Sequence, residues 1–200
     1  RAHDGAGSRC GLAMNVAGQV VVITGGGSGI GAALARRCAL DGAARVVVSD
    51  CHAAAAEAVA REIGGLAIAA DVADEAQTRA LIDETEHRCG PIGLFCANAG
   101  VTAQGGVELP DADWQRLWQI NVMAHVHAAR MLVPRLLARG GGHLLFSASA
   151  AGLLSQFDAP YAVTKHAAVA HAEWLSITYG NQGLGVSCLC PLGVDTPMLQ

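Results

Sequence analysis

Short apolar runs along the chain alternate with longer, Ala-rich segments in which apolar and polar residues recur at helical spacing. The apolar runs predict strands at residues 19–24, 45–50, 66–70, 93–97, 143–147 and 184–190. The segments between them predict helices at residues 29–40, 53–63, 74–89, 111–139 and 158–179. Pro134 is expected to kink the fourth of these helices near its end.

The strict alternation of strand and helix predicts an α/β fold, with a parallel sheet between two helical layers. The run Val20-Val21-Val22-Ile23 has no polar alternation, as expected of a strand that helices cover on both faces. No repeat and no linker divides the chain. Residues 15–200 are therefore predicted to form one domain with a doubly wound sheet. Residues 1–14 are predicted to be a disordered or non-native extension, with Met14 as the natural start.

Composition changes this picture little but excludes several partners. Hydrophobic residues make up 52% of the chain, charged residues 15%, and the net charge is -4, which fits a globular protein. There is no basic stripe, so nucleic acids and anionic membranes are not expected as partners. No apolar run is long enough to span a bilayer, and the seven dispersed cysteines fit reduced thiols, so a cytoplasmic protein is predicted.

No metal site is expected from the spacing of cysteines and histidines. Cys188 and Cys190 share one face of a predicted strand, but no second pair with ligand spacing accompanies them. His125 and His127 point to different sides of a predicted helix. These residues are interpreted as ordinary packing or surface side chains.

The first strand leads into the glycine-rich segment TGGGSGIG, residues 24–31, and then into a helix. Glycine allows the backbone to turn tightly and to approach a ligand closely. The N-terminus of the following helix offers unpaired N–H groups and a positive dipole to a pyrophosphate. Because the segment lies between a strand and a helix, it predicts dinucleotide binding in a Rossmann-type fold.

Asp50 ends the second predicted strand, where an acid can bind both ribose hydroxyls and repel a 2′-phosphate. Ser28 and Cys51 supply no basic group for such a phosphate, so NAD(H) is favoured over NADP(H). The alternative is that Asp50 is only a solvated strand end or a helix cap. Asp71, after the third strand, lies at the same edge, and a turn or capping role explains it almost equally well.

Tyr161 and Lys165 lie four residues apart, on one face of the last predicted helix. A tyrosine, with a pKa near 10, is a poor base at neutral pH, but a nearby ammonium stabilises the phenolate. Of the 13 Lys and Arg residues in the chain, Lys165 alone is a lysine. This pair predicts a proton donor and acceptor for alcohol–carbonyl chemistry.

Taken in order, these motifs resemble the short-chain dehydrogenase/reductase family over residues 15–200. The segments that carry the resemblance are TGGGSGIG, Asp71-Val72, Asn98-Ala99-Gly100, Asn121, the Ser149 region, YAVTK and Pro191 to Thr196. The resemblance implies hydride transfer between NAD(H) and an alcohol or ketone. It also implies a homotetramer or homodimer paired through the two long helices.

The resemblance implies roles for individual residues. Tyr161 is the general acid/base, Lys165 supports it and binds the nicotinamide ribose, Ser149 binds the substrate oxygen, and Asn121 helps to hold a water relay. Ser147 competes with Ser149, but counting back from Ala150-Ala151-Gly152 favours Ser149. The residues implied to touch the cofactor are Gly25, Ser28, Gly29, Ile30, Gly31, Asp50, Asp71, Val72, Asn98, Tyr161, Lys165, Val194 and Thr196.

Two departures from the family pattern stand out. Pro191-Leu192-Gly193 replaces the usual Pro-Gly, and the chain ends about 50 residues early. A domain truncated before its last strand, without a substrate lid, is therefore expected. The alternatives are an NADPH-dependent 3-oxoacyl-carrier-protein reductase and a non-catalytic dinucleotide-binding protein. The apolar residues Leu153, Leu154 and Phe157 suggest a hydrophobic substrate.

Overall fold

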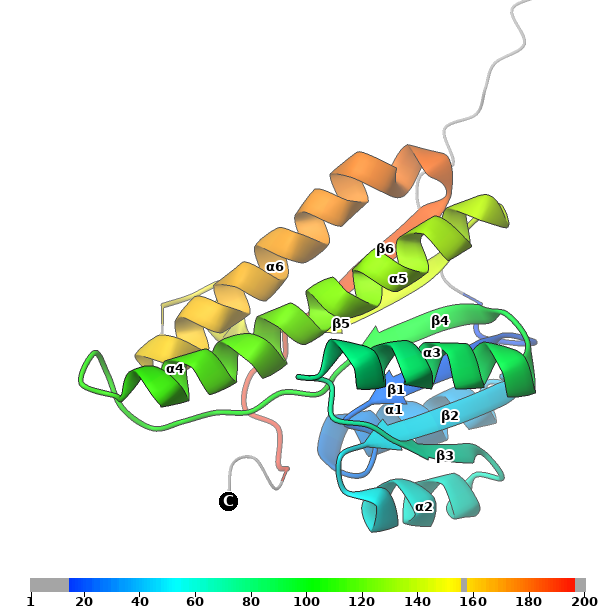
Figure 1. The fold of residues 1–200 in the computed structure, drawn as a ribbon, viewed down its shortest axis with the longest axis horizontal. Coiled ribbons are helices and arrows are strands. Elements are labelled where there is room, and N and C mark those ends of the chain that lie inside the picture. Colours follow the sequence, from blue (N-terminus) through cyan, green and yellow to red (C-terminus); the bar gives the residue numbers. More distant parts are fainter. Residues whose placement is uncertain (1–14, 156–157, 197–200) are drawn as a thin grey trace, which may run out of the picture.

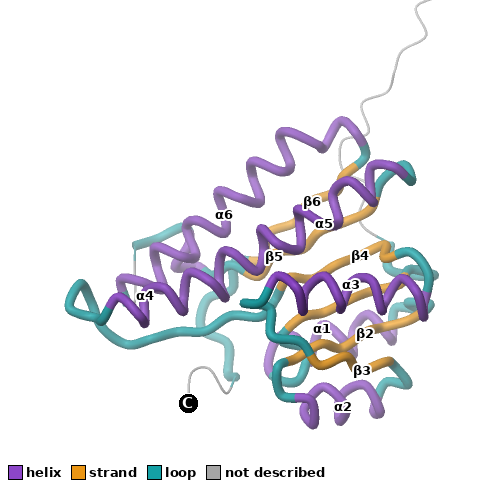
Figure 2. Tube along the Cα trace, viewed as in Figure 1, coloured by secondary structure: helices purple, strands orange, loops and turns teal. Residues whose placement is uncertain are grey.

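The computed structural model describes residues 15–155 and 158–196 (Figure 1). Six strands and six α-helices follow along these residues, with one helix between successive strands except for two between the fourth and the fifth strand (Figure 2). The strands are β1 (Val20–Thr24), β2 (Arg45–Asp50), β3 (Leu66–Ala69), β4 (Ile92–Ala97), β5 (Gly142–Ser147) and β6 (Leu184–Leu189). The helices are α1 (Gly29–Leu40), α2 (Ala53–Glu62), α3 (Glu75–Cys89), α4 (Asp111–Trp118), α5 (Ala124–Ala138) and α6 (Ala159–Tyr179).

All six strands pair in parallel, in the order β3-β2-β1-β4-β5-β6. The strand order reverses between β1 and β4, so the chain winds in opposite directions from this point. Ligands of such sheets bind in the crevice beyond the carboxyl ends of the strands at the reversal. The predicted doubly wound, Rossmann-type sheet is confirmed, and its carboxyl edge is where a site is expected. The N-terminal extension predicted for residues 1–14 lies outside the described residues.

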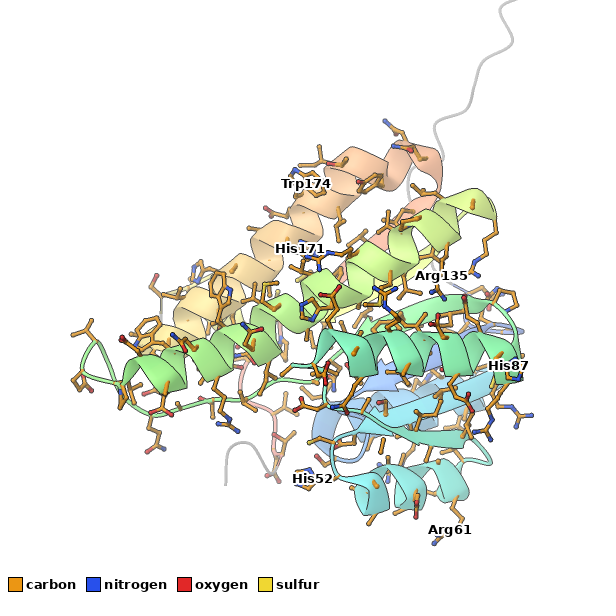
Figure 3. The ribbon with its side chains drawn as sticks, viewed as in Figure 1. His52, Arg61, His87, Arg135, His171 and Trp174 are labelled. Carbon is orange, nitrogen blue, oxygen red and sulfur yellow. The ribbon has the colours of Figure 1, made fainter. Side chains whose placement is uncertain are left out.

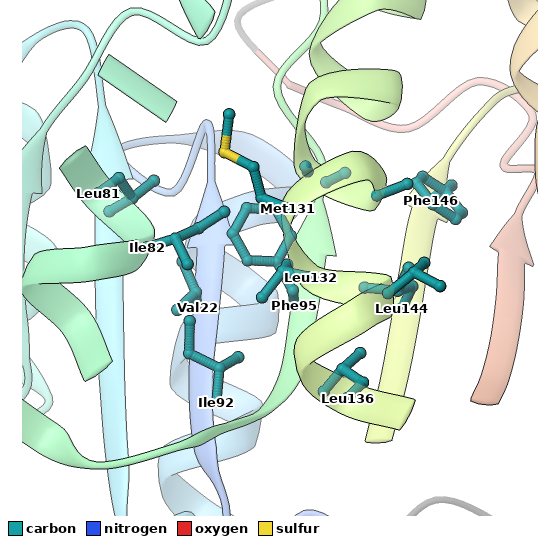
Figure 4. Packing of buried hydrophobic residues seen from close by; sticks show 14 of the residues in the cluster. Val22, Leu81, Ile82, Ile92, Phe95, Met131, Leu132, Leu136, Leu144 and Phe146 are labelled. Atoms are coloured by element: carbon teal, nitrogen blue, oxygen red, sulfur yellow. The ribbon is translucent and has the colours of Figure 1, made fainter. Parts of the chain in front are cut away.

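Alternate side chains of each strand enter two separate cores, because successive residues of a strand point to opposite faces. Val20 and Val22 join the core between the sheet and helices α3, α5 and α6, where Phe95, Leu132 and Phe146 are almost fully buried (Figure 4). The intervening residues of β1 pack on the other face, against α1 and α2. Both faces of β1 are therefore dry, which explains its unbroken apolar sequence.

Most predicted boundaries lie within one residue of the observed ones, and three differences bear on the site. Asp74 is the cap of α3 rather than its first residue, and its carboxylate accepts from the N–H groups of Ala76 and Gln77. Asp158 also precedes its helix, α6, but its carboxylate makes no capping bond and accepts from the N–H of Gly105 instead. The predicted helix over residues 111–139 is interrupted by a π-helical turn, Gln119–Met123, between α4 and α5. Such turns accommodate an inserted residue and have no clear sequence signature.

Candidate active site

The turn between β1 and α1 is built so that only glycine fits at two positions. Gly25 has φ 62°, and a Cβ there would lie 2.8 Å from the Cα of Ala99. A Cβ on Gly31 would overlap the carbonyl oxygen of Gly25. The turn therefore brings the N-terminus of α1 to the sheet edge, and the glycines themselves place no side chain there. Ser28, the N-cap of α1, makes no side-chain capping bond. The first-turn N–H groups, at Gly29 and Ile30 among others, have no partner within the helix.

Asp50 is tied to this glycine turn at the end of β2. Its Oδ2 accepts from the N–H of Gly27 at 3.1 Å, and its Oδ1 accepts from the N–H of His52 at 3.0 Å. The side chain is only 13% exposed. A carboxylate can accept about four hydrogen bonds, and the Cys51 thiol donates a third to Oδ1 at 3.6 Å, so Oδ2 keeps room for a ligand. The fixed carboxylate fits the predicted ribose position.

Asp71 is explained well by local structure. Its Oδ1 accepts from the N–H of Ala73 at 3.0 Å, and its own N–H donates to Oε1 of Gln77. The neighbouring Val72 is buried. The turn interpretation of Asp71 therefore has direct geometric support, and its predicted contact with adenine remains a prediction.

Asn98 joins the ends of three strands. Its Nδ2 donates to the carbonyl oxygens of Thr24 and Gly25, and its Oδ1 accepts from the hydroxyl of Ser147 at 3.0 Å. The Thr24 hydroxyl in turn accepts from the N–H groups of Asn98 and Ala99. These bonds fix the glycine turn to β4 and β5. Sequence reasoning did not assign this role to Thr24 or Ser147, because it depends on contacts between distant strands.

Lys165 is buried behind Tyr161. Its Nζ donates to the carbonyl oxygen of Ser147 at 3.0 Å and lies 5.6 Å from the centroid of the Tyr161 ring. The lysine is only 3% exposed, and this burial lowers the pKa of Lys165 to about 8. A cation beside an aromatic ring and away from water acts strongly on charge that develops on that ring.

The structure separates the two candidate serines. Ser147 has its hydroxyl committed to Asn98 and its carbonyl oxygen to Lys165. The Ser149 hydroxyl accepts from the N–H of Ala151 at 3.2 Å, so its proton stays available to a ligand. The residues on either side of Ser149 are held by β6 and the segment after it: Ala148 N–H donates to the Leu189 carbonyl, and Ala150 N–H donates to that of Pro191. This geometry favours Ser149 as the serine that contacts substrate.

Asn121 lies fully buried in the π-helical turn. Its Oδ1 accepts from the N–H of Val101, and its Nδ2 donates to the Val101 carbonyl and the Thr164 hydroxyl, at 2.9–3.1 Å. The amide thus fastens the loop after β4 to α6, next to Lys165. A Cβ on Gly100 would lie 3.2 Å from the Lys165 Nζ and 3.3 Å from the Asn121 Oδ1, so these groups converge on one point.

The segment after β6 folds back across the start of α1. Val194 and Thr196 line a hollow of about 390 Å³ together with Gly29 and Ile30. The predicted cofactor residues from the two ends of the chain therefore meet at one place. The described residues bring all the predicted site residues to the carboxyl edge of the sheet.

This arrangement is that of a dinucleotide-binding oxidoreductase, and comparison with known proteins identifies the family. A family profile described as short chain dehydrogenase matches residues 19–200. A 1-deoxy-11-beta-hydroxypentalenate dehydrogenase of Streptomyces exfoliatus is 40% identical over 197 residues, covering 94% of this chain and 71% of the relative. The chain belongs to the short-chain dehydrogenase family. It is an oxidoreductase that transfers hydride between a nicotinamide cofactor and an alcohol or ketone.

Solved structures agree with this assignment. A short-chain dehydrogenase/reductase of Burkholderia phymatum, in complex with NAD, matches with a TM-score of 0.89 and 34% identity over 93% of this chain and 69% of that chain. A 3-ketoacyl-(acyl-carrier-protein) reductase of Brucella melitensis, complexed with NADH, matches with a TM-score of 0.88 and 31% identity over 92% of this chain and 79% of that chain. In the part of this chain that the structure describes, no helix is long and apolar enough to cross a membrane.

Proposed function

We propose that the chain is an NAD(H)-dependent dehydrogenase of an apolar alcohol or ketone, with Tyr161 as general acid/base. One observation carries the proposal: the chain's sole lysine is buried, with its Nζ 5.6 Å from the centre of the Tyr161 ring. Burying an ammonium costs free energy, and Lys165 is nevertheless buried beside Tyr161, whose phenolate an ammonium stabilises. Such perturbed groups cluster at catalytic sites.

The residues divide the chemistry between them. The Ser149 hydroxyl donates to the oxygen of the substrate, and Tyr161 takes the proton of an alcohol or returns one to a ketone. The Lys165 ammonium stabilises the phenolate that forms. When bound, the nicotinamide accepts or supplies the hydride. Because the Asn121 side chain is committed to Val101 and Thr164, we assign it a positioning role in place of direct contact with the water relay.

The cofactor-binding half fits NAD(H). The glycine turn keeps the start of α1 clear for a pyrophosphate, and the carboxylate of Asp50 is held where it meets a ribose. A 2′-phosphate would place two like charges together. Gly25, Ser28, Gly29, Ile30 and Gly31 would hold the pyrophosphate, with Asn98, Val194 and Thr196 on the nicotinamide side. Asp71 and Val72 are proposed to touch the adenine.

Calorimetric titration of NADH against NADPH tests the cofactor preference. We expect NADPH to bind at least about tenfold more weakly, which corresponds to about 1.4 kcal/mol. Asp50→Asn should remove most of the difference, since the charge is lost and the shape kept. Glu57→Gln, the loss of an exposed carboxylate on α2, is the matched control and should preserve it. Equal binding by the unaltered protein would contradict the proposal.

The substrate is proposed to be apolar because Leu153 and Leu154, just after Ser149, are 59% and 53% exposed. The hydroxy acid named for the Streptomyces relatives belongs in the first screen, beside long-chain secondary alcohols. The rival activity, 3-oxoacyl-carrier-protein reduction, must be separated by substrate, because the Brucella reductase is itself complexed with NADH. Turnover of a 3-oxoacyl thioester but of no alcohol would favour the rival.

A homotetramer or homodimer is proposed, formed through α4, α5 and α6. Large apolar side chains remain exposed on α4 and α6: Trp118 at 42%, Ile177 at 81%, and Trp174, labelled in Figure 3, at 56%. Light scattering after gel filtration tests this proposal. A monomer at micromolar concentration would contradict it. A cytoplasmic location is proposed as well, and fractionation of the native cells would test it.

A further inference from the structure

Three consecutive residues at the end of β2 bring different metal-binding groups together. The Cys51 Sγ lies 3.6 Å from the Asp50 Oδ1 and 3.4 Å from the His52 Nδ1. The third side of the triangle, from His52 Nδ1 to Asp50 Oδ1, is also 3.4 Å. Within the described residues this is the one group of three such ligand atoms within 4.8 Å of one another.

The triangle has the dimensions of one face of a zinc tetrahedron. Zinc binds imidazole nitrogen at about 2.0–2.1 Å, carboxylate oxygen at about 2.0–2.2 Å and thiolate sulfur at about 2.3 Å. At tetrahedral angles these bonds give about 3.4 Å between nitrogen and oxygen, and about 3.6 Å from sulfur to either. Each observed edge lies within about 0.2 Å of these values. A cation above this face needs only small side-chain movements.

The surroundings of the triangle attract a cation. The Cys51 sulfur lies 3.6 Å from Oδ1 of the Asp50 carboxylate, so a negative charge already lies beside it. Among the ion pairs of the described residues, His52 is the sole partner of Asp50. Asp50 is itself fixed by the N–H of Gly27, which holds one ligand in advance. The His52 side chain is 84% exposed and lies at the rim of the fold, which leaves a metal open to water on its outer side (Figure 3).

We propose that Asp50, Cys51 and His52 bind a divalent zinc-type cation, with water as the fourth ligand, and that this cation and NAD(H) compete for Asp50. The competition rests on the proposed function, which assigns the Asp50 carboxylate to the ribose of NAD(H). The metal site itself does not rest on it. Metal binding releases the thiol proton, so the site fills more readily as the pH rises. The sequence prediction rested only on spaced cysteine and histidine pairs, and three consecutive ligands give no such spacing.

Cobalt(II) reports the site without any cofactor. We expect titration of the protein with Co²⁺ to give the visible bands of tetrahedral cobalt and a near-ultraviolet thiolate charge-transfer band, and Zn²⁺ to remove both. Cys51→Ser should abolish the thiolate band, and His52→Gln should weaken binding at least about tenfold. The double variant Cys188→Ser/Cys190→Ser is the matched control, because these two sulfurs lie 3.8 Å apart and are the rival source of a thiolate band. A thiolate band that survives Cys51→Ser, or is lost in this control, would overturn the site.

NADH titration with and without zinc tests the competition. With zinc at ten times its Kd, the apparent Kd of NADH should rise about tenfold, and Cys51→Ser should not respond to zinc. Cobalt binding at Cys51 together with unchanged NADH affinity in zinc would overturn the competition. Cobalt binding at Cys51 in a protein that never binds NADH would support the metal site and contradict the proposed function.

Discussion

The two halves of the site hold their functional groups in different ways. At β1 and β2 the fold presents backbone N–H groups and one partly exposed carboxylate, Asp50. At β5 and α6 it presents side chains that are almost wholly buried: Lys165 is 3% exposed and Ser149 7%. The nucleotide half depends on close backbone contacts that only glycine allows. The catalytic half depends on buried polar groups that the protein holds in place: Lys165 by the Ser147 carbonyl oxygen and Ser149 by the N–H of Ala151.

The difference predicts how each half fails. Added volume damages a site built from close backbone contacts, because the neighbouring carbonyl or Cα cannot move aside. Loss of a functional group damages a site built from buried side chains while the fold survives. Variants of the two halves should therefore separate binding from turnover.

The largest effect is expected at Lys165. Lys165→Met should lower kcat about 10³-fold, because the phenolate loses its cation. Thermal stability should change little, since burial already disfavours the charged lysine. Arg61→Met, the loss of an exposed cation on α2, is the control and should leave kcat unchanged (Figure 3). Steady-state kinetics and a melting curve check both; normal turnover by Lys165→Met would show that the ammonium has no catalytic role.

The substitution Gly31→Ala, in the nucleotide half, should have a smaller effect, on stability and NADH binding in place of kcat. In Gly31→Ala the new Cβ meets the Gly25 carbonyl and lies 2.6 Å from Nδ2 of Asn98. We expect about 2–3 kcal/mol less stability, with NADH binding lost or severely weakened. Gly180→Ala is the control, because nothing lies within 4 Å of its Cβ position. Urea titration measures the stability, and equal effects of the two variants would contradict the packing argument.

A third effect concerns pH and His125, a buried histidine of α5. Burial first, then Lys165 and His171, lower the pKa of His125 to about 3, and the ring packs 5.2 Å from that of Phe146. Below about pH 6.5 the unfolded chain therefore binds a proton at His125 and the folded chain does not. The free energy of unfolding is highest above about pH 6.5 and falls below it. Between pH 6.5 and pH 5 the loss from this residue is about 2 kcal/mol.

His125→Phe should remove much of this acid sensitivity and leave the smaller part due to His143 and His171, whose pKa values burial also lowers. His87→Gln, at an exposed position, should leave it unchanged. Denaturation midpoints at pH 7 and pH 5 measure the effect. The same acid sensitivity in His125→Phe as in the unaltered protein would contradict the assignment.

Much of this account could be predicted from the sequence. Apolar runs broken by glycine predicted every strand to within one or two residues, because burial on both faces of a parallel sheet leaves a strong signal. The glycine turn, Asp50 and the Tyr161–Lys165 spacing carry local chemistry that short motifs display. Contacts between distant segments left no such signal, so the π-helical turn at Asn121 and the bond from Ser147 to Asn98 emerged only from the fold.

The most direct test of the central claim compares the chain's two tyrosines, Tyr161 in the site and Tyr179, which packs edge-on against Trp174. NADH formation from NAD and an accepted alcohol would be followed for the unaltered protein, Tyr161→Phe and Tyr179→Phe, with NADH affinity measured for each. The account predicts that Tyr161→Phe binds NADH normally but loses about 10³-fold in kcat, whereas Tyr179→Phe turns over normally. Undiminished turnover by Tyr161→Phe would contradict it.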